Sequence, residues 1–173
     1  MAEELKVIHY PDPRLKKPSS AVREFNQPLA DLAAQMFVIM RQEKGVGLAA
    51  PQVAKNIRLF VMNATGDPKD DKVYVNPVLS DGEGEEEGEE GCLSIPELRI
   101  KVIRSRSMRI AAQDLAGKPI NETDDGFVAR IWQHETDHLN GILLTDRMGP
   151  VAKIANRGLL KELEEKYRKE KGK

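Results

Sequence analysis

Hydrophobic residues recur every three or four positions in three stretches of the chain, which predicts three helices. The first stretch follows Asn26, a candidate helix cap, and Pro28, which suits a first helical turn. We expect this N-terminal helix to end before Gly45. Its apolar stripe consists of Leu29, Leu32, Ala33, Met36, Phe37 and Met40.

The other two helical patterns lie in the second half of the chain. Residues 126–139 follow three candidate caps, Thr123, Asp124 and Asp125, and the pair Asn140 and Gly141 offers a C-terminal stop. The residues that recur on one side of this central helix are Val128, Ile131, His134, Glu135 and His138. Residues 154–168 predict a last amphipathic helix. Its apolar side consists of Ile154, Leu159, Leu160 and Leu163.

Shorter hydrophobic runs predict strands between these helices. Residues 57–62 and 73–75 have the composition of buried strands, and residues 98–102 and 108–112 that of an antiparallel ribbon. Residues 5–8 fit either a short strand or an extended arm. A turn over residues 114–118 precedes a further short strand and then the central helix. Antiparallel strands with helices segregated around them predict an α+β fold, its sheets packed around the central helix.

Length and composition favour a single domain over residues 1–173, with residues 150–173 as a C-terminal helix and basic tail. With 40% hydrophobic and 32% charged residues, the chain resembles an ordinary soluble protein. A net charge of −1 gives no field toward DNA or a membrane surface. Residues 1–6 lack the basic start and apolar core of a signal peptide, and one cysteine allows no internal disulfide. We therefore expect a cytoplasmic protein with no membrane contact.

Charge is nevertheless uneven along the chain. Residues 81–90 contain seven acids and no base, which predicts a solvated, mobile loop. Residues 151–173 contain eight Lys or Arg against four Glu, a net charge of +4.

The central helix contains the pattern His134-Glu135-Thr136-Asp137-His138. Residues four apart on a helix lie on one face, about 5–6 Å apart at Cβ, so both imidazoles can reach one metal ion. Glu135 can then approach a water molecule bound to the same ion. A catalytic site of this kind needs a third protein ligand and an open position. In one metalloprotease family that ligand follows six residues later, but here Leu144 occupies the position, so the ligand must come from elsewhere.

Two other segments have small or reactive residues. Residues 45–53 are glycine-rich but lack the ending of a phosphate-binding loop, so an ordinary helix-to-strand loop is the simplest interpretation. The single cysteine, Cys92, fits either a small buried residue or a thiolate presented where a loop becomes extended chain.

Taken together, three segments resemble peptide deformylase. That family carries a Gly-x-Gly-x-Ala-Ala-x-Gln loop, a Glu-Gly-Cys-Leu-Ser segment and a Gln-His-Glu-x-Asp-His helix, in this order. Here they are residues 45–52, 90–94 and 133–138. The likeness extends to residues 9–15 and over essentially the whole chain, and it is weakest in the acidic run and the C-terminal tail.

The resemblance implies that Cys92 is the third metal ligand, beside His134 and His138. It also implies hydrolysis of the formyl group from the formyl-methionine terminus of newly synthesised polypeptides, with release of formate. Metal-bound hydroxide attacks the formyl carbon, and Glu135 acts as general base and then as general acid. By the same resemblance, the developing oxyanion is stabilised by the Leu93 backbone N–H, the Gln52 side chain and the metal.

By the same resemblance, the loop Gly45, Val46 and Gly47 pairs with the extended substrate. Phe127 and Ile131 are candidates for the pocket that holds the methionine side chain. Arg99 and Arg130 either reach the substrate or form surface ion pairs, and Gln133 and Asp137 are expected to pack or support. The family implies one divalent ion, Fe²⁺ in the cell, although Zn²⁺, Ni²⁺ and Co²⁺ also suit this donor set.

The resemblance also implies that the basic C-terminal helix contacts the ribosome, while a helix packed on its own domain is the alternative. The sequence does not predict an oligomeric state. Two other functions stay open. One is a zinc-type peptidase that cleaves internal bonds and uses a ligand other than Cys92. The other is a non-catalytic module whose metal is structural, but such a site fills four protein ligands and gives Glu135 no role.

Overall fold

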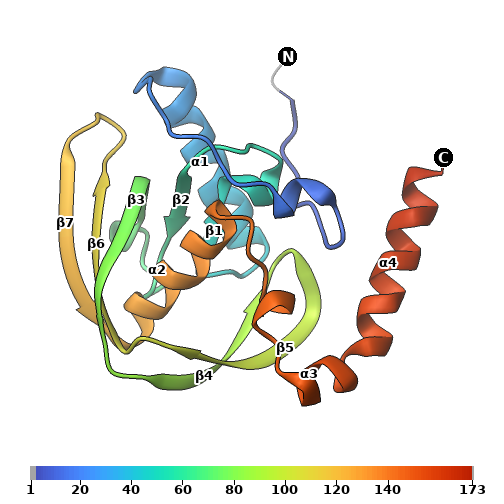
Figure 1. The fold of residues 1–173 in the computed structure, drawn as a ribbon. Helices are drawn as coiled ribbons and strands as arrows, with labels where there is room; N and C mark the ends of the chain where they lie inside the picture. The colour runs from blue at the N-terminus through green and yellow to red at the C-terminus, as the bar shows by residue number, and fades with distance from the viewer. Residues whose placement is uncertain (1–2, 173) are drawn as a thin grey trace.

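The computed structural model describes residues 3–172, so Met1, Ala2 and Lys173 of the predicted N-terminal and C-terminal segments lie outside it. Four helices and seven strands form the described part (Figure 1). The helices are α1 (Gln27–Gln42), α2 (Gly126–Leu139), α3 (Pro150–Ala155) and α4 (Arg157–Lys171). The strands are β1 (Gly47–Ala49), β2 (Leu59–Met62), β3 (Lys72–Glu83), β4 (Glu86–Cys92), β5 (Ile95–Arg104), β6 (Ser107–Gln113) and β7 (Pro119–Asp125). Short 3₁₀ turns are η1 (Pro13–Lys16), η2 (Ala50–Val53), η3 (Pro68–Asp70) and η4 (Leu144–Arg147).

The strands form two antiparallel sheets, as the predicted α+β class requires. One sheet has five strands in the order β1-β2-β3-β6-β7, and the other is the hairpin β4-β5. In Figure 1, β3, β6 and β7 lie to the left of α2, and the hairpin lies below it and to its right. The predicted ribbon of residues 98–102 with 108–112 is wrong, because β5 pairs with β4 while β6 pairs with β3 and β7.

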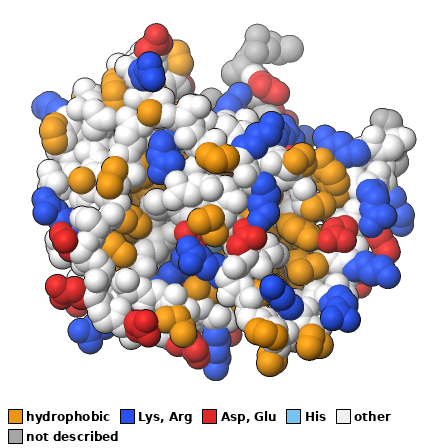
Figure 2. All heavy atoms as spheres, in the orientation of Figure 1, with side chains coloured by type: hydrophobic (Ala, Val, Ile, Leu, Met, Phe, Trp, Pro, Cys, Tyr) orange, Lys and Arg blue, Asp and Glu red, His pale blue; other side chains and the backbone are white. Residues whose placement is uncertain are grey.

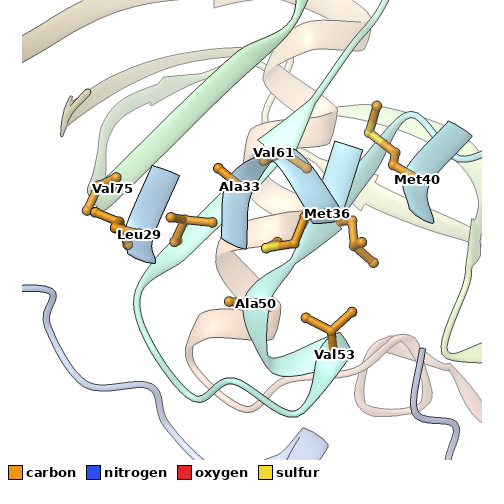
Figure 3. Packing of buried hydrophobic residues seen from close by; sticks show 10 residues of the cluster. Leu29, Ala33, Met36, Met40, Ala50, Val53, Val61 and Val75 are labelled. Carbon is orange, nitrogen blue, oxygen red and sulfur yellow. The ribbon is translucent and has the colours of Figure 1, made fainter. Parts of the chain in front are cut away.

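Helix α1 begins and ends where its pattern predicts. The Asn26 side chain caps it by accepting a hydrogen bond of 3.2 Å from the Leu29 N–H. Leu29, Ala33 and Met36 face the sheet and contact the buried side of β2 and η2 (Figure 3). Burying a Leu or Met side chain is worth about 1.5–3 kcal/mol, so this cluster anchors the sheet edge that carries β1.

Helix α2 packs on the other face of the sheet through a second cluster. Trp132 is fully buried and meets Tyr74 edge to face, with ring centroids 5.9 Å apart. Phe60 and Ile131 belong to the same cluster. This apolar contact fixes the rotation of α2, and thereby the direction in which its two histidines point.

The acidic run of residues 81–90 is not a mobile loop. Residues up to Glu83 continue β3, and β4 begins at Glu86. The prediction was wrong because β4 pairs with a basic strand: Glu89 lies 3.1 Å from Arg99 across the hairpin. Cross-strand pairs of opposite charge stabilise a sheet and offset the repulsion within the acidic strand.

The C-terminal segment forms two helices rather than one. The helix is interrupted at Asn156, and Gly158 follows two residues later; both residue types are weak helix formers. Ile154 therefore lies on α3 and is 66% exposed, contrary to the prediction, and Val151 beside it is also exposed. Figure 2 shows exposed apolar side chains at the lower edge of the molecule, over α3.

Helix α4 packs on the N-terminal arm and on β5. Leu159, Leu160 and Leu163 contact the cluster that contains Ile95 and Leu98. The Tyr10 hydroxyl donates a hydrogen bond of 2.7 Å to Glu164. No helix within residues 3–172 is both long enough and apolar enough to cross a membrane.

Candidate metal centre

The two histidines of α2 and the cysteine that ends β4 converge on one point. One donor atom each from Cys92, His134 and His138 lies within 4.8 Å of the others. Cys92 Sγ is 3.3 Å from His138 Nε2, and the two imidazole centroids are 5.1 Å apart. A thiolate and two imidazoles at this spacing match the donor set and size of a mononuclear site for a borderline-soft divalent metal.

Cys92 is placed by the turn that ends the hairpin. The pairing of β4 with β5 shifts register between Gly91 and Cys92, so Leu93 and Ser94 form a tight connection to Ile95. The Gln52 amide then holds this turn. Its nitrogen donates to Ser94 Oγ at 3.1 Å and lies 3.6 Å from Cys92 Sγ, while its oxygen accepts from the Ala49 N–H at 2.9 Å.

A buried charge cluster supports the histidine ligand. His134 Nδ1 lies 2.9 Å from Glu90 Oε1, which leaves Nε2 to face the other ligands. Histidines that bind metals usually donate their second ring N–H to a carboxylate in this way. Arg104 forms a two-pronged pair with Glu90 at 2.8 and 3.0 Å and reaches Asp137 at 2.7 Å.

Sequence reasoning assigned no role to Glu90 or Arg104. Both are about 5% exposed, which is rare for charged residues unless they are paired. Glu90 precedes Cys92 by two residues in the matched motif, so its position was visible, but its partner comes from a strand 14 residues later. Asp137 and Gln133, which were expected to pack or support, both make hydrogen bonds: Asp137 pairs with Arg104, and Gln133 bonds the Ser105 backbone.

The surroundings shift the pKa values of the two imidazoles in opposite directions. Burial and the nearby charge of His134 lower the pKa of His138 well below its ordinary value. Burial would also lower the pKa of His134, but hydrogen bonds with Cys92 and Glu90 raise it well above the ordinary value. An imidazole binds a metal ion only in its unprotonated form, so a metal ion held by His134 would compete with protonation of that ring.

Glu135 lies beside the three donors without joining them. Its Oε1 is 3.9 Å from His134 Nε2, and its Oε2 is buried with no hydrogen-bond partner among the described residues. Burial raises the pKa of this carboxyl to about 7. Gly47 allows the close approach of β1, since a Cβ there would lie only 2.7 Å from Glu135 Oε1.

A groove of about 640 Å³ runs over the metal centre. Gly45, Val46 and Gly47 line one wall, and residues from Glu89 to Leu93 line the other. The remaining predicted substrate residues also border it, namely Arg99, Phe127, Arg130 and Ile131. His9, although distant in sequence, lies at the same groove because the N-terminal arm is bonded to Gln52 and Ser94 through the backbones of Ile8 and Tyr10.

The helix with two histidines and a glutamate, together with a cysteine donor and an open groove, defines the site of a metal-dependent hydrolase. The family model for polypeptide deformylase matches residues 4–153, and the chain belongs to this family. Proteins of the family remove N-formyl groups from nascent peptides. The predicted family, fold class and enzyme class are thus confirmed.

Individual relatives agree over nearly the whole chain. Peptide deformylase of Rhodopirellula baltica is 39% identical over 97% of this chain and 85% of its own length. That of Chromobacterium violaceum is 38% identical over 92% and 96%. The crystal structure of a peptide deformylase from Legionella pneumophila superposes with a TM-score of 0.89 at 38% identity, covering 96% of this chain and 98% of its own.

Proposed function

We propose that the chain removes the formyl group from peptides that begin with formyl-methionine, using one divalent metal ion held by Cys92, His134 and His138. The observation that carries this proposal is the convergence of the three donor atoms within 4.8 Å of one another, beside an open groove that Cys92 and His134 line. With three protein ligands, a tetrahedral ion keeps one position for water or substrate.

The ion, when bound, would lower the pKa of a coordinated water molecule and polarise the formyl oxygen. Glu135 would take the proton from that water and later deliver it to the leaving amine. Its buried position and its pKa of about 7 suit both roles, because the carboxyl can hold and release a proton near neutral pH.

The developing oxyanion would be met by the Gln52 amide and the Leu93 backbone N–H. Gln52 is 1% exposed, and its oxygen is fixed by Ala49, so its NH₂ group is directed toward the cysteine side of the site. A donor fixed in advance needs no reorganisation during the reaction, which is the source of its catalytic value.

The peptide substrate would add as a further strand along β1. This strand is the last one in the five-stranded sheet, paired only with β2 among the described strands, so its other edge faces the groove. Main-chain bonds to Gly45, Val46 and Gly47 would give affinity without selecting the side chains that follow. The methionine side chain would enter between Phe127 and Ile131.

Fe²⁺ in a reducing cytoplasm is the metal that we propose. Such a site binds Fe²⁺ more weakly than Zn²⁺. The supply of iron in the cell, rather than affinity, would therefore lead to iron in the site. Cys92, next to an open position, would be exposed to oxidation once oxygen binds. Enzyme purified without oxygen should contain iron and lose activity in air, while nickel-loaded enzyme should survive. Equal stability of both forms in air would argue against iron.

Helix α4 is the proposed contact with the ribosome. Its basic side chains, such as Lys161 and Lys169, are exposed, whereas Leu159, Leu160 and Leu163 hold the helix to its own domain. Replacing Lys161, Arg168 and Lys169 by Gln leaves that packing intact, and it should weaken co-sedimentation with ribosomes at low salt. Unchanged co-sedimentation would favour a helix that serves only its own domain.

The deciding experiment is formate release from formyl-Met-Ala-Ser compared with its acetyl analogue. Deformylation of the first and no reaction with the second would support the proposal. Cleavage of an internal peptide bond, with metal retained when Cys92 is replaced, would favour a zinc-type peptidase. Tight metal binding without any hydrolysis would favour a structural site.

A further inference from the structure

The hairpin β4-β5 faces α2 through charged side chains rather than through apolar packing. The apolar residues of β5, among them Leu98 and Ile100, pack with Leu15 and Leu144, and that cluster includes no residue of α2. The hydrogen bonds between the hairpin and α2 join polar groups. They connect Glu90 with Arg130 and His134, Arg104 with Asp137, Cys92 with His138, and Arg130 with two backbone oxygens.

Arg130 directly precedes Ile131, a residue of the proposed methionine pocket, on α2. Its guanidinium donates to Glu90 Oε2 at 2.6 Å, to the Glu86 carbonyl at 2.7 Å and to the Val102 carbonyl at 3.1 Å. The side chain is 12% exposed, so it is not a surface ion pair. Charge-assisted bonds of this kind are roughly twice as strong as neutral ones.

Gly88 lets the guanidinium lie directly on β4. A Cβ on Gly88 would meet Arg130 Cζ at 3.0 Å, a contact tighter than ordinary packing. The next residue along α2, Ile131, lines the groove together with Phe127, and Glu89 to Cys92 of β4 line it as well. The spacing between α2 and β4 at Arg130 therefore affects the width of the groove where these two segments border it.

We propose that Arg130 is a positioning residue that fixes β4 against α2 and thereby decides which first side chain the enzyme accepts. This inference rests on the proposed deformylase function. Arg130 acts through the hairpin, since three of its five N–H donors bond Glu86, Glu90 and Val102. A pocket wall that is held by several hydrogen bonds from one guanidinium excludes a larger side chain more strongly than a wall that can move.

The test is Arg130→Met, which keeps the length of the stem and removes the fork. Formyl-Met-Ala-Ser and formyl-Phe-Ala-Ser are compared in cobalt-loaded enzyme. The preference for Met over Phe in kcat/KM should fall by about tenfold, a size typical of pocket discrimination. KM for the methionine peptide should rise while kcat changes little, and the visible absorption of the bound cobalt should stay unchanged.

A second variant tests the contact independently. Gly88→Ala should relax selectivity in the same direction, because its Cβ displaces the Arg130 guanidinium. In an Arg130→Met background the same change should add little, since the clashing group is gone; contacting residues give such non-additive cycles. Additive effects of the two changes would overturn the proposal.

Lys101→Met is the matched control. Lys101 is a cation of the same hairpin, it is exposed, and its pair with Glu87 is long at 4.0 Å. Selectivity should be unaffected by this change. A Met-to-Phe preference within twofold of wild type in Arg130→Met would refute the inference, as would a changed cobalt spectrum with lost kcat. Absence of deformylation by the wild-type enzyme would instead refute the proposed function.

Discussion

Different kinds of interaction hold the two halves of the candidate metal centre in place. Helix α2, with His134 and His138, lies on the sheet through buried Trp132 and its apolar neighbours. The β4-β5 hairpin, with Cys92, meets that helix through the cluster of Glu90 and Arg104. Apolar packing tolerates exchange of similar volumes, whereas a buried charge left without its partner costs several kcal/mol. The cysteine side of the site is therefore the more sensitive one to single changes.

Replacing Cys92 by Ala should have the largest effect, because it removes the hairpin's only contribution to the ligand set. Two imidazoles from one helix remain, and these alone do not complete a three-ligand site. We expect loss of most bound metal and nearly all activity, measured by elemental analysis and formate release. A variant with full metal occupancy would show that the hairpin does not supply a ligand.

Glu135→Gln changes the helix half without touching a ligand. Metal content should stay at the wild-type level, while the rate of the chemical step falls by about 10²–10⁴-fold, as for other general acid–base groups. Single-turnover formate release at saturating peptide measures this step. Activity within a few-fold of wild type would rule out Glu135 as the proton carrier.

Gln52→Leu addresses the residue that joins β1 to the turn of the hairpin, since the Gln52 side chain bonds Ala49 of β1 and Ser94 of that turn. Loss of one oxyanion donor costs about 2.7–4 kcal/mol in transition-state binding. The expected result is a lower kcat with little change in KM. If only KM changes, Gln52 serves to hold the substrate.

What the sequence predicted well is local in origin. The cap at Asn26, the apolar spacing of α1 and the spacing of His134 and His138 depend on residues within a few positions of one another, and the structure agrees with each. Hydrophobic periodicity and capping act over one or two turns, so they are visible in sequence without any knowledge of the fold.

What the sequence predicted badly depends on distant partners. The acidic run resembled a loop because its counter-charges, such as Arg99, lie on the opposite strand of a hairpin. Glu90 became part of the site only through Arg104 and His134, and β5 was given the wrong neighbour because strand pairing is not encoded in one strand's own pattern. The prediction that Ile154 lies on the apolar side of the last helix was wrong because a weak helix former, Asn156, separates α3 from α4.

Glu90→Gln removes the charge at the centre of the hairpin's contact with α2. Arg104 and Arg130 lose their shared carboxylate, and His134 loses the acceptor that orients it. Removing such a partner of a metal ligand typically lowers metal affinity or activity by about 10–100-fold. Competition with a zinc chelator measures the affinity. Unchanged affinity would show that α2 alone orients His134.

The smallest effect should follow from Tyr10→Phe, which removes the bond from the N-terminal arm to Glu164 of α4. Such a hydrogen bond to a charged group is worth about 1.5–3 kcal/mol when shielded and less where water competes. Deformylation should be unchanged, and hydrogen exchange in α4 should become faster.

The contribution of the Tyr10 hydroxyl to the free energy of unfolding depends on pH. Burial and the Glu164 carboxylate raise the pKa of Tyr10 to about 12, so folding favours the protonated phenol. The stabilisation is therefore complete below the unfolded pKa of about 10 and is lost as the pH rises toward about 12. Urea unfolding of both proteins should show a constant difference from pH 7 to about 9.5 and a shrinking one above it. A difference that is already lost near pH 8 would mean that the hydroxyl has another partner in solution, and α4 would then owe its position to Leu159, Leu160 and Leu163 alone.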